Sequence, residues 1–106
     1  MKNFNQQALL KSAKLLDELF AKYQYSSKDV KAAYEQCKPL ILKVLSGDVD
    51  KASIERLPGG YFSTEFDLFY LEDLYKASAN FNMYIAGWES EELYNKYMEN
   101  LLKERK

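Results

Sequence analysis

NQQALLKSAKLLDELFAKY, residues 5–23, is the most clearly helical stretch of the chain and decides its fold class. Apolar residues recur in it at spacings of four and three, the period of one face of an α-helix. These residues are Leu9, Ala13, Leu16, Phe20 and Tyr23, with Leu15 and Leu19 widening the stripe. Asn5 is placed to cap the helix, and Phe4 to pack on Leu9 as a hydrophobic staple. The stretch therefore predicts a helix that buries one face.

A second helix is predicted to begin within residues 25–30, YSSKDV. Ser26 and Asp29 have the spacing of a capping box, and Tyr25 with Val30 repeats the staple geometry. The apolar stripe that follows is Val30, Ala33, Tyr34, Cys37, Ile41, Val44 and Leu45. The helix therefore has both a start signal and a face for the core.

Pro39 interrupts this second apolar stripe, and Gly47 follows its end. Proline removes one backbone hydrogen bond and clashes with the carbonyl four residues earlier, so we expect a kink or a break at residues 35–39. Glycine is the usual residue just after a helix C-terminus, so Gly47 should end the helix.

The middle of the chain has weaker signals. A short helix is predicted over residues 49–57, between a cap at Asp48 and a stop at Pro58. After the turn signal Gly59-Gly60, Thr64 and Asp67 have capping-box spacing, which predicts a helix over residues 65–78. Residues 79–88, ANFNMYIAGW, alternate like a strand too isolated to build a sheet, and we interpret them as a loop or an irregular helical turn.

A last helix should begin at Ser90, with Glu91 and Glu92 in its first turn, where the helix dipole favours acids. Its apolar stripe is Leu93, Tyr94, Tyr97, Met98, Leu101 and Leu102. Together the segments predict an all-α fold: a compact single-domain bundle of four to five helices, with residues 1–106 forming one helical domain.

The residue inventory excludes most catalytic and metal sites. The 106 residues contain no histidine, which removes histidine bases, histidine-assisted nucleophiles and histidine-ligated metals. The single cysteine, Cys37, cannot form an intramolecular disulfide or a thiolate metal site, and is interpreted as a buried core residue in a reducing compartment. No phosphate-binding glycine loop or calcium loop is present. We therefore expect no enzyme activity and no cofactor.

Charge and aromatic residues are concentrated in the C-terminal half. Residues 61–99 contain two basic and eight acidic residues, a net charge of −6, and 11 of the 16 aromatic residues of the chain. An acidic, aromatic region suits a basic partner and argues against direct nucleic-acid binding. No long apolar run is present, so we expect no signal peptide, no membrane span and a cytoplasmic protein.

Within this region, Phe69 is the candidate anchor for a partner. On a helix over residues 65–78, most aromatic residues, including Tyr70 and Tyr75, share one broad core face, whereas Phe69 lies on the opposite face among acids. A covering loop or helix could equally explain its position. If it is an anchor, the acids around it would steer and pair with basic groups of the partner. The predicted partner-binding residues are Glu65, Phe69, Glu72, Asp73, Trp88, Glu89, Glu91 and Glu92.

The acidic and aromatic stretch from YFSTEFDLFYLEDLY (residues 61–75) to WESEE (residues 88–92) resembles the small immunity proteins with which bacteria neutralise their own toxins, as in colicin and contact-dependent inhibition systems. The resemblance is one of class, in size, helical make-up and this stretch, and it transfers no residue roles. It implies tight one-to-one binding to a cognate toxin, expected to be a basic nuclease domain. The chain itself would be a monomer or a weak dimer.

Two other functions stay open on the sequence. One is a small helical adaptor or regulatory subunit, possibly dimeric through its tyrosine-rich stripes, with no catalytic activity. The other is a small enzyme that depends only on carboxylates, which would need a concave pocket with converging acids.

Overall fold

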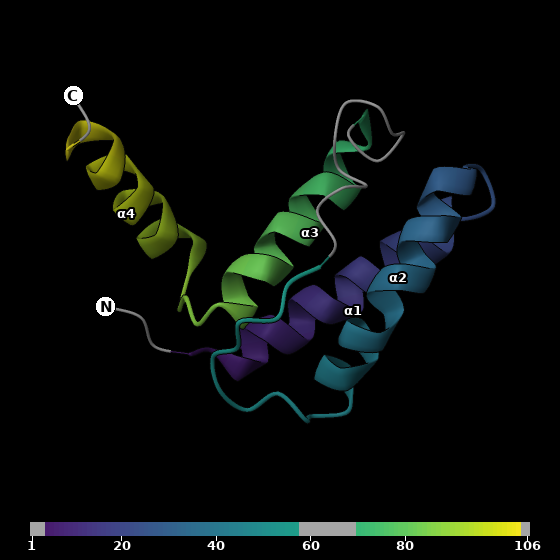
Figure 1. Cartoon of the computed structure of the whole chain (residues 1–106), viewed down its shortest axis with the longest axis horizontal. Coiled ribbons are helices and arrows are strands. Elements are labelled where there is room, and N and C mark those ends of the chain that lie inside the picture. The colour runs from purple at the N-terminus through teal and green to yellow at the C-terminus, as the bar shows by residue number, and fades with distance from the viewer. Residues whose placement is uncertain (1–3, 58–69, 105–106) are drawn as a thin grey trace.

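The computed structural model of the chain describes residues 4–57 and 70–104, and in these ranges it contains helices and no strand (Figure 1). The helices are α1 (Gln6–Tyr23), α2 (Lys28–Leu45), α3 (Glu72–Ile85) and α4 (Glu91–Glu104). The predicted all-α class is confirmed, and the described residues contain four helices against the four to five expected.

The helix α1 follows its prediction closely. Asn5 is the N-cap, and its side-chain oxygen accepts a hydrogen bond from the Ala8 amide at 3.0 Å. The fully buried positions are Leu9, Ala13, Leu16 and Phe20. Leu15, expected to widen this face, is 50% exposed. The buried stripe of α1 is therefore narrower than the sequence suggests.

The helix α2 begins one residue later than predicted, with Ser27 as the N-cap in place of Ser26. The Val30 amide donates to the Ser27 hydroxyl at 3.3 Å. Tyr25 is 89% exposed, so the expected staple between Tyr25 and Val30 does not form. Because the cap is one residue later, Tyr25 falls in the turn before the helix and points into solvent.

Pro39 lies inside α2, and the helix continues through it without the predicted break. Pro39 and Glu35 are both on the exposed side of α2, so water can bind the carbonyl that loses its helical partner. Gly47 ends the helix as predicted, with a φ of +82°. Its amide donates to the Val44 carbonyl at 3.0 Å, and the Asp48 amide donates to the Lys43 carbonyl at 3.2 Å, the two bonds of a Schellman motif.

The predicted helix over residues 49–57 is wrong, because this segment crosses the molecule without helical structure. Val49 and Leu57 are buried at its two ends. Its backbone pairs with other elements: the Ser53 amide donates to the Ile85 carbonyl at 2.9 Å, and the Leu57 amide donates to Asn82 Oδ1 at 2.9 Å. These tertiary hydrogen bonds replace the local ones that a helix would make.

The helix α3 differs most from the prediction. It begins at Glu72 after the N-cap Leu71, so the prediction of a single helix over residues 65–78 is wrong. The proposed cap residues Thr64 and Asp67 lie outside the described residues. It continues to Ile85, so the interpretation of residues 79–88 as a loop or irregular turn is wrong for residues 79–85.

Gly87, with a φ of +102°, terminates α3. Its amide donates to the Tyr84 carbonyl at 3.0 Å, and the Trp88 amide donates to the Met83 carbonyl at 3.3 Å. This is the same Schellman motif that ends α2. The chain then turns through residues 86–90 into α4, where the Ser90 hydroxyl accepts from the Leu93 amide at 3.2 Å, as the sequence predicted.

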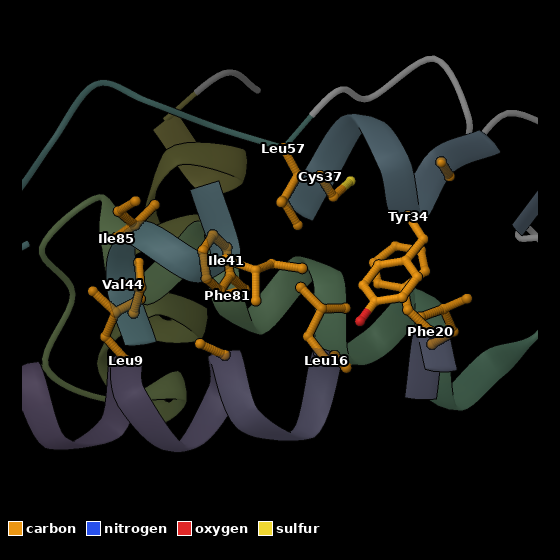
Figure 2. Packing of buried hydrophobic residues seen from close by; sticks show 14 of the residues in the cluster. Leu9, Leu16, Phe20, Tyr34, Cys37, Ile41, Val44, Leu57, Phe81 and Ile85 are labelled. Atoms are coloured by element: carbon orange, nitrogen blue, oxygen red, sulfur yellow. The ribbon is translucent and has the colours of Figure 1, made fainter. Parts of the chain in front are cut away.

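The helix α1 packs against both α2 and α3, and the buried cluster between them is the core (Figure 2). Phe20 of α1 and Tyr34 of α2 stack with ring centroids 5.2 Å apart, and the Tyr34 hydroxyl donates to Asp17. The helix α4 contributes no fully buried residue among its described side chains and stands away from the other helices (Figure 1).

Cys37 is fully buried in this core, as predicted, and burial raises the pKa of its thiol from 9.0 to about 12. Burial, with the nearby Asp17 carboxylate, also raises the pKa of Tyr34 from 10.0 to about 12. Both groups hold their proton more tightly when folded. Their contribution to stability is therefore complete below the unfolded pKa values and is lost as pH rises through the range 9 to 12.

We predict that Cys37→Ala will reduce the sensitivity of stability to alkaline pH. Between pH 8 and pH 10.5 the wild-type protein should lose about 2 kcal/mol more of its free energy of unfolding than Cys37→Ala, because only the wild type has the thiol to ionise when unfolded. Urea unfolding followed by circular dichroism at the two pH values measures this difference. Equal losses in both proteins would contradict the prediction.

Candidate protein-binding surface

The end of the molecule where α1 finishes and α3 begins carries an exposed group of tyrosines and acids. The helices α1 and α3 run side by side in opposite directions (Figure 1). At one end, Asn5 before α1 donates to the Glu89 carbonyl after α3, at 3.1 Å. At the other end, the Tyr23 hydroxyl donates to Asp73 Oδ2 at 2.9 Å, across 50 residues of sequence. We call this end the tyrosine-rich surface, made of Tyr23, Tyr25, Tyr70, Glu72, Asp73 and Tyr75.

The tyrosines of this surface are exposed to an unusual degree for large rings. Tyr25 is 89% exposed, Tyr70 is 69% exposed and Tyr75 is 43% exposed, whereas Tyr23 is half-buried. A tyrosine ring offers apolar area at low entropic cost, and its hydroxyl can form a hydrogen bond at the edge of a contact. Tyrosine is accordingly enriched in protein interfaces. The exposed rings thus favour a surface that another protein covers.

Two acids lie between these rings because of the way α3 starts. Glu72 and Asp73 are in its first turn, where the helix dipole stabilises negative charge. Leu74 is buried in the core. At 100° per residue, Glu72 then lies nearly opposite the core, with Asp73 on one flank and Tyr75 on the other. The two carboxylates therefore lie next to each other on the exposed side of α3, between Tyr75 and the Tyr23 that bonds to Asp73.

Of the predicted partner-binding residues, Glu72 and Asp73 lie on the tyrosine-rich surface. Glu65 and Phe69 lie outside the described residues. The other four lie beyond the C-terminus of α3, in the connection to α4 and its first turn: Trp88, Glu89, Glu91 and Glu92. Since α3 has 14 residues, its two ends are about 20 Å apart. The structure therefore separates the predicted residues into two groups at opposite ends of α3.

Trp88 is only 8% exposed and joins α4 to α3. Its ring contacts Tyr94 edge-on at a centroid distance of 5.5 Å and Tyr97 at 5.0 Å. These rings border a groove of about 450 Å³ between α3 and α4, which Asn82 and Met83 also line. The position of Trp88 favours a packing role within the chain over direct contact with a partner.

Sequence reasoning missed four residues of the tyrosine-rich surface: Tyr23, Tyr25, Tyr70 and Tyr75. Tyr23, Tyr70 and Tyr75 were assigned to core faces, and Tyr25 to a staple. The only signal that could have identified them is the total of nine tyrosines, more than a small core needs. Their meeting at one end follows from the antiparallel packing of α1 and α3, which no local pattern encodes.

The described residues offer little for other kinds of site. They contain no group of three or more cysteine and acidic side chains placed to hold a metal ion. None of the helices in residues 4–57 and 70–104 has the length and apolar character needed to cross a membrane.

Comparison with known proteins adds no relationship: no family model, no curated protein and no solved structure matches the chain.

Proposed function

We propose that this protein is a cytoplasmic immunity protein, which binds a basic toxin domain through the tyrosine-rich surface and so neutralises it. The observation that carries the proposal is the packing of α1 against α3, with the hydrogen bond between Tyr23 and Asp73 at one end, which places exposed tyrosines from two distant segments around the acids of α3. An inhibitor that acts by binding needs a surface complementary to the toxin in shape and charge, and it needs no catalytic group. The residue composition, without histidine and with one buried cysteine, is compatible with this requirement.

The partner that best fits this surface is a basic nuclease domain. A nuclease cleft is positively charged because it binds phosphates, so Glu72 and Asp73 would attract it at long range and compete with its substrate. Exposed rings such as Tyr70 would then supply the contact area from which water is expelled. The resemblance to toxin-neutralising immunity proteins supports the same partner class. We propose no direct contact with nucleic acid or membrane, no catalytic activity and no cofactor.

A helical adaptor or regulatory subunit is the second candidate, and α4 is the observation that favours it. Its apolar stripe has no fully buried residue, and Leu102 is 62% exposed. An adaptor would use this face to hold a second protein.

The proposed binding surface can be tested by two charge-reversed variants that change the net charge equally. Glu72→Lys with Asp73→Lys reverses the acids of the tyrosine-rich surface, and Glu91→Lys with Glu92→Lys reverses those at the other end of α3. We expect the first variant to bind the cognate basic toxin domain about 100-fold more weakly, and the second to bind nearly as the wild type does. Calorimetry at low and high salt measures both affinities, and salt should weaken wild-type binding.

A structural control separates lost charge from a lost internal hydrogen bond. Tyr23→Phe removes the bond to Asp73 and leaves both acids in place. It should retain most of the affinity if the charges act directly on the partner. Equal weakening in both double variants would exclude the tyrosine-rich surface as the binding site. Failure of the wild-type protein to bind the toxin domain or to protect cells that express it would refute the immunity function.

A further inference from the structure

The groove of about 450 Å³ between α3 and α4 combines an aromatic wall with one cation. The wall is formed by Trp88, Tyr94 and Tyr97, and Trp88 contacts both tyrosines. The cation is Arg56, from the segment between α2 and α3. Sites for small molecules usually have volumes of about 300–1,000 Å³. The groove is therefore large enough for a molecule roughly the size of one or two amino acids.

Arg56 is fixed by the backbone and is not neutralised by an acid. Its Nη1 atom donates to the carbonyls of Ser53 and Glu55, each at 2.7 Å. These two bonds hold the guanidinium and leave its Nη2 and Nε donors for another acceptor. Glu55 is paired with Lys43 at 3.0 Å, and no carboxylate among the residues that the structure describes forms an ion pair with Arg56. The guanidinium is thus positioned to bind an anion.

Asn82 adds a second donor to the same groove. Its Oδ1 accepts from the Leu57 amide at 2.9 Å, so its remaining polar atom, Nδ2, can only donate. The described residues that line the groove include no acid; Glu91 and Glu92 lie nearby, in the first turn of α4. A guanidinium matches the two oxygens of a carboxylate, and a single cation suits one negative charge better than the two of a phosphate.

We propose that this groove binds a small carboxylic acid that carries an aromatic ring. Its carboxylate would accept hydrogen bonds from Arg56 and Asn82, and its ring would pack on Trp88 and Tyr97, since aromatic rings favour offset or edge-on contact. Because Arg56 and Tyr97 are exposed to solvent, we expect a dissociation constant on the order of 1 mM. The site lies toward the C-terminus of α3, away from the tyrosine-rich surface, and does not rest on the proposed function.

Two probes test the site in the whole protein: N-acetylphenylalanine and its neutral amide, which share the ring and differ in charge. Trp88 is the single tryptophan of the chain, so its indole N–H signal in a proton–nitrogen correlation spectrum reports on the groove without overlap. The acid should shift this signal to saturation, and the amide should bind about tenfold more weakly. Equal binding of the two probes, or an unmoved Trp88 signal, would overturn the inference.

Two variants with the same loss of charge test the role of Arg56. Arg56→Gln removes the cation of the groove, whereas Lys51→Gln removes an exposed cation from the same segment outside it. We expect Arg56→Gln to weaken the acid about tenfold and leave the amide unchanged, so that the two probes bind alike. Lys51→Gln should preserve the preference for the acid. Thermal unfolding verifies that both variants are folded. Equal weakening of the acid by both variants would contradict a site at Arg56.

The aromatic wall and the size of the ligand are tested separately. Tyr97→Leu should weaken both probes about threefold, because it removes a ring and keeps an apolar side chain. Tyr75→Leu is its control, since Tyr75 is similarly exposed, at 43%, but lies on the tyrosine-rich surface. Equal effects of the two variants would exclude the aromatic wall. A tetrapeptide of three glycines and a C-terminal phenylalanine should bind no more tightly than N-acetylphenylalanine. Binding at least about tenfold tighter would identify a protein C-terminus as the occupant and overturn the assignment to a small molecule.

Discussion

Phe81→Ala should lower the free energy of unfolding by about 3–5 kcal/mol, the largest stability loss that we expect from any single substitution considered. Phe81 is fully buried and belongs to the cluster that includes Leu16 of α1 and Ile41 of α2 (Figure 2). Its removal would leave a cavity where elements distant in sequence meet, because the walls of a packed core relax only partly. Urea unfolding monitored by circular dichroism measures the loss.

Ile54→Ala provides the control for this measurement. Ile54 lies in the segment between α2 and α3 and is 96% exposed, so its truncation should change stability by no more than about 0.5 kcal/mol. The comparison separates burial from hydrophobicity, since both variants remove a large apolar side chain. A loss below about 1 kcal/mol for Phe81→Ala would show that α3 does not pack on the core as described.

Gly87→Ala should destabilise the protein by about 3 kcal/mol, for two reasons that add together. The φ of Gly87 is +102°, a conformation that residues with a Cβ rarely adopt. A Cβ at this position would also approach the Cβ of Ala52 to 2.8 Å, well inside van der Waals contact. Because the turn at Gly87 packs against the segment between α2 and α3, relief of the clash requires the backbone of one of them to move.

Gly47→Ala is the matched control, because Gly47 occupies the same position in the Schellman motif that ends α2. Its φ is +82°, and a Cβ there would meet no atom within 4 Å. This substitution should cost only about 1 kcal/mol, from the backbone conformation alone. Thermal unfolding of the two variants measures the difference, which isolates the contact with Ala52. Equal losses at both glycines would show that this contact is absent in solution.

The helices that bury a single face could be predicted from the sequence. In α1, all four fully buried positions belong to the predicted stripe, and in α2 the same holds for buried positions such as Val30 and Ile41. Asn5 and Gly47 were also identified as helix boundaries, since caps act through local hydrogen bonds. Local chemistry was sufficient in these cases.

The C-terminal half of α3 could not be predicted because it is covered on two sides. Phe81 and Ile85 face the core with α1, whereas Met83 lies on the opposite side beside Trp88. Burial of all three residues produces an alternating pattern that is typical of a strand, although the backbone is helical. The alternation of apolar residues reflects which elements cover the two sides of α3, and these elements are set by the tertiary fold.

The segment before α3 was misread for a related reason. Asp48 offered a cap signal, but the backbone of residues 49–57 pairs with α3 and leaves no local helix.

The candidate surface was predicted only in its acids, Glu72 and Asp73. Its exposed tyrosines depend on the docking of α1 against α3, a long-range contact that periodicity does not report.

The hydrogen bond between Tyr23 and Asp73 also has a consequence for the order of folding. The hairpin of α1 and α2 closes through a short turn, whereas the contact of Tyr23 with Asp73 must close a loop of 50 residues. Loop closure costs more entropy as the loop lengthens, so we expect the α1–α2 hairpin to form first and α3 to dock later. The two halves of the tyrosine-rich surface would come together only in that late step. A partially folded chain would then lack the complete surface, so a partner that recognises all of it would select the fully folded molecule.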